Sequence, residues 1–323
     1  MVDWDRKSRS AGNANEREDD AEAARQGRQR KPDDIPKQGA WGRTEYIAGN
    51  VETNDFQPTT FETGESYRIG PPTRPSTIGF DNGFADFAKQ PATAGDYLAL
   101  AKWKAMVAGA EALRPDLTDG VAGYRHYLEG NGARRAFSYE RYVISDAAGQ
   151  ATLRNAILDF QDAVIELAIA NPKLTRFSVT GPAIPCGSKD TNQFPYIVNH
   201  FPYPATENWQ KAIGAHVIWL SGTVEIEQRK TAYDETIFTT MMELQAEDRY
   251  NFNPGDADMA TAIPDDDNGR FEVTGLAKQY DSYSSLRRRL QWSGVELGVT
   301  LSERPHTTRL RQPSNNRRAR NRI

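Results

Sequence analysis

The stretch that decides the fold is TIFTTMMELQAED, residues 236–248. Its residues alternate with a period of two, as in a strand that buries one face. Phe238, Thr240, Met242 and Leu244 form one side of that alternation. The preceding AIGAHVIWLSGTVEIEQ, residues 212–228, is also typical of one or two strands, and RKTAYDE between the two segments is a plausible hairpin loop. We therefore predict an antiparallel hairpin here.

Upstream of this hairpin the apolar residues repeat with the helical period of 3.6. The pattern predicts helices over residues 95–114, 120–129 and 152–171, with Tyr97 and Leu98 on the apolar side of the first. Thr152 would cap the third, which we expect to be buried. Residues 137–143 suggest a strand, followed by a turn at 146–149, and two further strands are expected at 176–184 and 291–302. The prediction is an α+β fold, with N-terminal helices packed on a mainly antiparallel C-terminal sheet.

Composition divides the 323 residues into three parts. Residues 1–45 mix acids and bases with few large apolar side chains, which predicts a disordered charged leader. Residues 46–303 form one globular domain by this division. Residues 304–323 hold seven arginines and no acid, which predicts a second disordered tail. This tail lacks interleaved aromatic residues, so we expect no sequence-specific nucleic-acid binding.

Charge, cysteine content and hydropathy exclude several classes of protein. The net charge of -4 gives no global argument for an anionic partner. The lone Cys186 permits neither an intramolecular disulfide nor a thiolate zinc cluster. The N-terminus has no apolar signal-peptide core, and no apolar run reaches the roughly 18–20 residues of a membrane helix. We expect synthesis in the cytoplasm, with a dedicated secretion system as the route of any export.

Polar residues directly after the strand at 236–248 are the first candidates for a catalytic site. Side chains at a strand end often project into a cleft, so we predict a catalytic role for this short segment. A second group, around YRHY and the downstream YER, could supply acid/base chemistry. The candidate catalytic residues are Asp248, Arg249, Tyr250, Asn253, His126, Glu140 and Arg141.

Tyr280, Tyr283 and Arg287 are candidate ligand-binding residues. Tyrosines beside arginines suit an anionic ligand such as a phosphate or a lipid head group, or an anionic membrane surface. The alternative is that these rings pack within the fold and hydrogen-bond through their hydroxyls.

Aspartates that follow the catalytic candidates form an acid-rich loop. Carboxylates on a flexible turn can gather a hard divalent cation through oxygen ligands. The candidate metal ligands are Asp256, Asp258, Asp265 and Asp267. DDDNG lacks the full spacing of a calcium loop, and the alternative is a turn in which Asp and Asn hydrogen-bond their own backbone.

Three phrases carry a family resemblance: FSYERYV, ATENWQKAIGAHVIWLSG and AEDRYNFNPGDADMATAIPDDDNGRFEVTGLAKQY. They resemble C-terminal domains of bacterial secreted, polymorphic-toxin-type effector proteins. The resemblance implies a delivered toxin that acts on an anionic or cell-envelope target, with delivery machinery or an immunity protein as partner. It implies no mechanism. The alternative is a non-enzymatic structural or binding module of a larger assembly, because charged ends often become ordered only on assembly.

Overall fold

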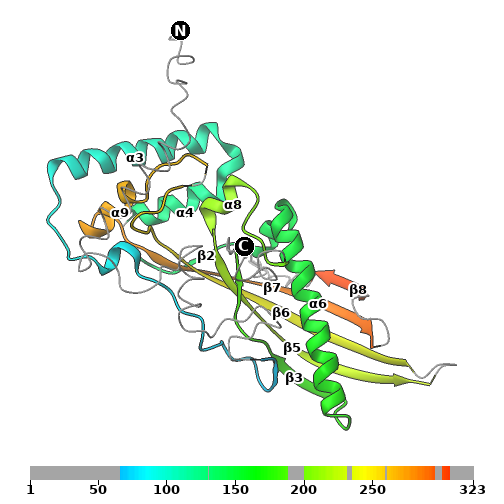
Figure 1. Ribbon diagram of the computed structural model, residues 1–323. Coiled ribbons are helices and arrows are strands. Elements are labelled where there is room, and N and C mark those ends of the chain that lie inside the picture. Colours follow the sequence, from blue (N-terminus) through cyan, green and yellow to red (C-terminus); the bar gives the residue numbers. More distant parts are fainter. Residues whose placement is uncertain are drawn as a thin grey trace, which may run out of the picture.

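The computed structural model describes residues 66–129, 131–187, 200–230, 235–258, 260–294 and 300–305. The predicted α+β class is confirmed: helices accompany one mainly antiparallel sheet (Figure 1). The predicted leader lies outside the described residues, as does all of the predicted C-terminal tail except its first two residues. No helix in the described ranges has the length and apolar character needed to cross a membrane.

Three long strands form the centre of the sheet. These are β5 (His216–Arg229), β6 (Glu235–Tyr250) and β7 (Tyr280–Ser293), each antiparallel to its neighbour. The described sheet has the order β1-β3-β5-β6-β7-β2, with β4 also paired to β5 and β8 to β7. The shorter strands are β1 (Arg68–Ile69), β2 (Arg135–Ala136), β3 (Arg176–Thr180), β4 (Ile184–Cys186) and β8 (Thr300–Pro305).

The alternation that predicted β6 is confirmed. Phe238, Thr240, Met242 and Leu244 are buried, whereas the residues between them are half-buried. Leu244 lies in register with a leucine on each side, Leu220 of β5 and Leu286 of β7. The buried face of the hairpin is therefore continuous across three strands, and β6 is a central strand. Its register brings the C-terminal residues of β6 to the helical end of the molecule (Figure 1).

Helix α6 (Ala147–Ala170) covers the buried face of the sheet (Figure 1). Phe160 and Val164 are fully buried against it. Gly222 permits the contact, since a Cβ there would lie 3.1 Å from the Phe160 ring. The predicted start at Thr152 was wrong, as was the turn at 146–149. Asp146 caps the helix, and its Oδ1 accepts hydrogen bonds from the backbone N–H groups of Ala148 and Gly149 at 2.8 and 3.3 Å.

A second group of helices gathers at the end of the long strands opposite the β5–β6 connection (Figure 1). Thr93 and Asp96 begin the longest of them with a capping box. The helices of this end, with the short turns beside them, are η2 (Gly83–Asp86), α3 (Ala94–Leu113), η3 (Pro115–Leu117), α4 (Thr118–Leu128), α8 (Glu207–Ala212) and α9 (Asp266–Val273).

Three other predictions were wrong. The strand expected at 137–143 is mainly helix α5 (Tyr139–Ser145), whose first turn is capped by Ser138. Tyr97 and Leu98 do not face the core, since their exposed fractions are 57% and 72%. The last long strand begins at Tyr280 rather than at residue 291. The sequence prediction missed its first part because arginines and serines alternate there with the buried residues.

Candidate functional site

A cavity of about 380 Å³ lies where β6 ends against the second group of helices. Helices α3, α4 and α8 and the segment after β6 supply its walls. The described residues that matter most to its chemistry are Trp103, Val107, Ala110, Arg114, Val121, Tyr124, Glu207, Lys211, Asp248, Arg249, Tyr250, Asn251, Asn253, Asp256, Asp258, Asp265 and Asn268.

One wall of the cavity is apolar and aromatic. Trp103 of α3 packs edge-on against Tyr124 of α4, with ring centroids 5.7 Å apart. Val107 and Val121 continue this wall and belong to the buried cluster of the helical end. Tyr124 donates a hydrogen bond to the side-chain oxygen of Asn268. Burial raises the pKa of Tyr124 well above its ordinary value, so the phenol stays protonated and can only act as a neutral donor or acceptor.

The opposite wall is polar and comes from the end of β6. Asp248 is 4% exposed, and its carboxylate accepts a hydrogen bond of 3.3 Å from Ser282 of β7. The backbone N–H of Asn253 donates to Asp265 at 3.1 Å, which anchors the segment after the strand. Asn251 donates to Asp81. These contacts hold carboxylate and amide groups in place around the cavity.

Close packing of Gly83 fixes the segment after β6 from behind. The φ angle of Gly83 is +46°, a left-handed conformation that glycine adopts without strain. A Cβ at this position would lie 2.3 Å from the carbonyl oxygen of Phe252. The backbone N–H of Phe84 donates to that same carbonyl at 3.3 Å. Any side chain at Gly83 would therefore displace the residues that form the polar wall.

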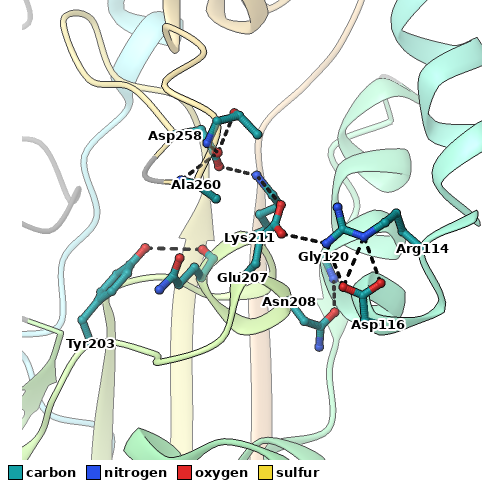
Figure 2. A network of polar contacts seen from close by, with 11 residues as sticks. Arg114, Asp116, Gly120, Tyr203, Glu207, Asn208, Lys211, Asp258 and Ala260 are labelled. Atoms are coloured by element: carbon teal, nitrogen blue, oxygen red, sulfur yellow. Dashed lines mark hydrogen bonds and ion pairs between the residues drawn. The ribbon is translucent and has the colours of Figure 1, made fainter. Parts of the chain in front are cut away.

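Charged residues form a chain along one side of the cavity (Figure 2). Arg114 contacts Asp116 at 2.7 Å and Glu207 at 2.8 Å. Lys211 contacts Glu207 at 3.6 Å and Asp258 at 2.5 Å. The chain links the end of α3, helix α8 and the loop before α9. It also places two cations, Arg114 and Lys211, in the lining of the cavity, where Arg249 of β6 is a third cation among several acids.

The pKa values of this chain follow from its pairing. Hydrogen bonds to Asp116 and then to Glu207 raise the pKa of Arg114 above its ordinary value. Burial acts to raise the pKa of Asp258, but hydrogen bonds from Lys211 and Thr261 outweigh burial and lower it. Arg114 and Asp258 are therefore charged at neutral pH.

A stack of aromatic rings supports the cavity from outside. The Tyr250 and Tyr280 rings lie parallel, with their centroids 5.1 Å apart. The His126 ring contacts the Tyr280 ring edge-on, with a centroid distance of 4.4 Å. The Tyr280 hydroxyl donates to the carbonyl of Gly123 at 2.9 Å. Tyr250 is the member of this stack that lines the cavity.

The structure separates the candidate catalytic residues into two sets. Asp248, Arg249, Tyr250 and Asn253 all line the cavity. The other set does not: His126 bonds to the carbonyl of Ala133 at 2.7 Å, Glu140 pairs with Arg288 at 2.8 Å, and Arg141 pairs with Asp119. These three side chains hold helices α4 and α5 in place.

The candidate ligand-binding residues do not converge. Tyr280 is buried in the aromatic stack, whereas Tyr283 is 40% exposed beneath the guanidinium of Arg134. Arg287 pairs with Glu243 at 3.0 Å on the neighbouring strand. Tyr283 and Arg287 have odd numbers in β7 and so share its exposed face, away from the cavity.

The candidate metal ligands are also divided. Asp256, Asp258 and Asp265 line the cavity, whereas Asp267 is exposed on α9. Across the described ranges, no three His, Cys, Asp or Glu side chains are grouped as metal ligands. The DDDNG sequence begins helix α9 instead of forming an acidic loop.

Sequence reasoning missed Arg114, Lys211 and the aromatic wall. Lys211 lies on α8, a short helix that the sequence patterns did not predict. The available signal was Thr206 followed by Glu207, Asn208 and Trp209, an N-terminal pattern before a short amphipathic turn. Arg114 and Lys211 are 97 positions apart, so their common charge chain had no local signature.

No protein-family model and no curated protein matches the chain. Among solved structures, one similar chain is PaeM, a colicin M-like bacteriocin produced by Pseudomonas aeruginosa. The TM-score is 0.32 and the identity 15%, and the match covers 54% of this chain and 50% of PaeM. The neighbour is a bacterial toxin, and the match spans about half of each chain. A likeness this distant assigns neither a family nor the role of any residue.

Proposed function

We propose that the cavity is the active site of a toxin-type effector domain that acts on an anionic component of the cell envelope. The observation that carries this proposal is the convergence of the buried Asp248 carboxylate with Arg114 and Lys211 in one cavity of about 380 Å³. Cavities of this size hold small ligands or a part of larger ones.

The cations of the lining favour an anionic group. Lys211 has three N–H donors and contacts two carboxylates, so a third donor remains for a ligand. Arg114 offers a planar set of donors that matches phosphate and carboxylate oxygens. Components of the cell envelope commonly carry such groups, which supports an envelope target.

The two walls of the cavity suit two different parts of a ligand. The aromatic and apolar wall, with Trp103 and Val107, suits an apolar or ring-shaped portion. The polar wall suits the reacting group. Asp248 is the residue that we assign as general base, because a carboxylate that lines a cavity can accept a proton from a bound hydroxyl or water.

Expression with and without an export signal tests the proposal. Wild-type protein should slow bacterial growth when it is sent to the periplasm. Asp248→Asn preserves shape but removes the proton acceptor, and should reduce inhibitory potency about a hundredfold. Asp86→Asn is the matched control, because Asp86 is exposed and has no partner among the described residues.

Two outcomes would contradict this proposal. Wild-type protein without effect on growth in either compartment would remove the toxin assignment. An Asp248→Asn variant as inhibitory as Asp86→Asn would remove Asp248 from the chemistry. The first outcome favours the binding module of a larger assembly, for which light scattering should show concentration-dependent association.

A further inference from the structure

Helix α3 exposes apolar side chains along most of its length. Of its twenty residues, only Asp96 and Val107 are buried. Leu98 and Leu113 are 72% and 80% exposed, and Met106 is 45% exposed. Surface helices normally turn polar residues outward. The outward side of α3 therefore needs a physical explanation.

Helical geometry places small and apolar residues at the centre of this outward side. At about 100° per residue, they lie roughly 100–180° around the helix axis from the buried Val107. We call these residues the α3 outer strip: Leu98, Ala101, Ala105, Ala108 and Ala112. All five are exposed and none is charged.

Two lysines flank the α3 outer strip, one on each side. Lys102 and Lys104 have no hydrogen-bond or ion-pair partner among the described residues. The acids of the helix, by contrast, are paired: Asp96 with Arg270 and Glu111 with Arg125. The exposed side of α3 therefore combines an apolar centre with uncompensated positive charge at its margins.

A groove of about 290 Å³ runs beside the strip, between α3 and α4. Val107, Ala108 and Leu128 form its apolar floor. Lys104, Arg125 and Glu129 also line the groove, and Arg125 is paired with Glu111. Lys104 is therefore the cation of this groove that can meet an anionic head group.

We propose that the α3 outer strip docks on a lipid surface that contains anionic phospholipid. Leu98 would enter the head-group boundary, while Lys102 and Lys104 extend sideways to lipid phosphates. The inward side of α3 contributes Trp103 and Val107 to the cavity, so docking brings the cavity to the membrane surface.

Charge favours a membrane over a second copy of the chain as the partner of the α3 outer strip. Two α3 helices packed strip to strip would bring the lysines of both copies together, while the acids of α3 are already paired with arginines. An anionic surface balances the charge of the lysines, at about 1 kcal/mol for each lysine near it. The proposal does not depend on the chemistry of the cavity, and the test below does not measure growth.

Vesicle flotation tests the proposal with the full chain. Wild-type protein should float with vesicles of phosphatidylcholine and phosphatidylglycerol in equal amounts, and bind vesicles of phosphatidylcholine alone far less. Leu98→Glu should lower the partition coefficient about tenfold or more. Lys102→Gln and Lys104→Gln should each lower it about fivefold, and added salt should have a similar effect.

Two matched controls keep the test specific to α3. Ile169 is 75% exposed on α6, and Lys173 is exposed beyond it. Ile169→Glu and Lys173→Gln should bind like wild type. Wild-type protein that stays unbound on anionic vesicles would overturn the proposal, as would equal losses in Ile169→Glu and Leu98→Glu. A third outcome would assign the strip to a second copy of the chain: wild-type protein that forms dimers but does not bind vesicles, with dimers that Leu98→Glu dissociates.

Discussion

The sheet with α6 and the helical end each have a buried apolar cluster, but the helical end adds ion pairs and a cavity. Around Phe160, Leu220 and Leu244 the side chains are fully buried and apolar. At the helical end, α3 is fastened by ion pairs such as Arg270–Asp96 and Arg114–Glu207. Close packing in the first region fixes the end of β6, whereas the second leaves a cavity beside it. The comparison places the larger buried apolar cluster in one region and the cavity beside the other.

Truncation of the core should give the largest effect. Phe160→Ala should lower the free energy of unfolding by about 3–5 kcal/mol, because a buried ring is lost and a void remains. Urea denaturation measures this change. Ile169→Ala on the same helix is the control, since Ile169 is 75% exposed and should change stability by less than about 0.5 kcal/mol. Similar losses in the two variants would show that α6 is not packed as described.

A buried acid in the same region should make its stability depend on pH. Asp159 of α6 is 8% exposed and accepts a hydrogen bond of 2.6 Å from Tyr67. Burial raises the pKa of Asp159 from 3.8 to about 7, partly offset by Tyr67. The folded state thus holds a proton that the unfolded state has lost. This contribution is complete below about pH 4 and is lost as the pH rises through 7.

Asp159→Asn should therefore be more stable than wild type at pH 8, by at most about 4 kcal/mol, and match it near pH 4. His216 makes stability depend on pH in the opposite direction, because burial lowers its pKa from 6.5 to about 4. Its contribution is lost as the pH falls below 6.5. Both proteins contain His216, so its contribution cancels when the free energy of unfolding of the variant is compared with that of wild type. A difference that is constant from pH 4 to pH 8 would contradict the assignment to Asp159.

Asp146 tests how the two regions are joined. Besides capping α6, its Oδ2 accepts hydrogen bonds of 2.8 Å from both the backbone N–H and the hydroxyl of Thr206, just before α8. Asp146→Ala leaves these buried donors unpaired and should cost about 3 kcal/mol. Hydrogen exchange should show the loss of protection at α8 as well as at the start of α6. Loss confined to α6 would mean that the cap alone matters.

Sequence patterns predicted the elements whose burial is periodic. The β5–β6 hairpin and the body of α6 follow directly from alternation and from the 3.6-residue period. The failures came where one side of an element is polar. Strand β7 presents arginines and serines on its exposed face, and α8 spans only six residues among prolines.

The candidate site was predictable only on the strand side. Asp248 to Asn253 follow a strong strand, so their position at its end could be read from the sequence. Arg114 and Lys211 reach the cavity through contacts between distant helices, which no local pattern encodes. His126, Glu140 and Arg141 share aromatic and charged surroundings in the sequence, yet their partners are structural.

The most direct test of the central claim measures stability and growth inhibition on the same Asp248→Asn protein. The account predicts a urea midpoint within error of Asp86→Asn, because the substituted amide can still accept from Ser282. It also predicts that Asp248→Asn inhibits growth from the periplasm with about a hundredfold lower potency. An Asp248→Asn protein that folds normally and inhibits growth as strongly as wild type would contradict the account.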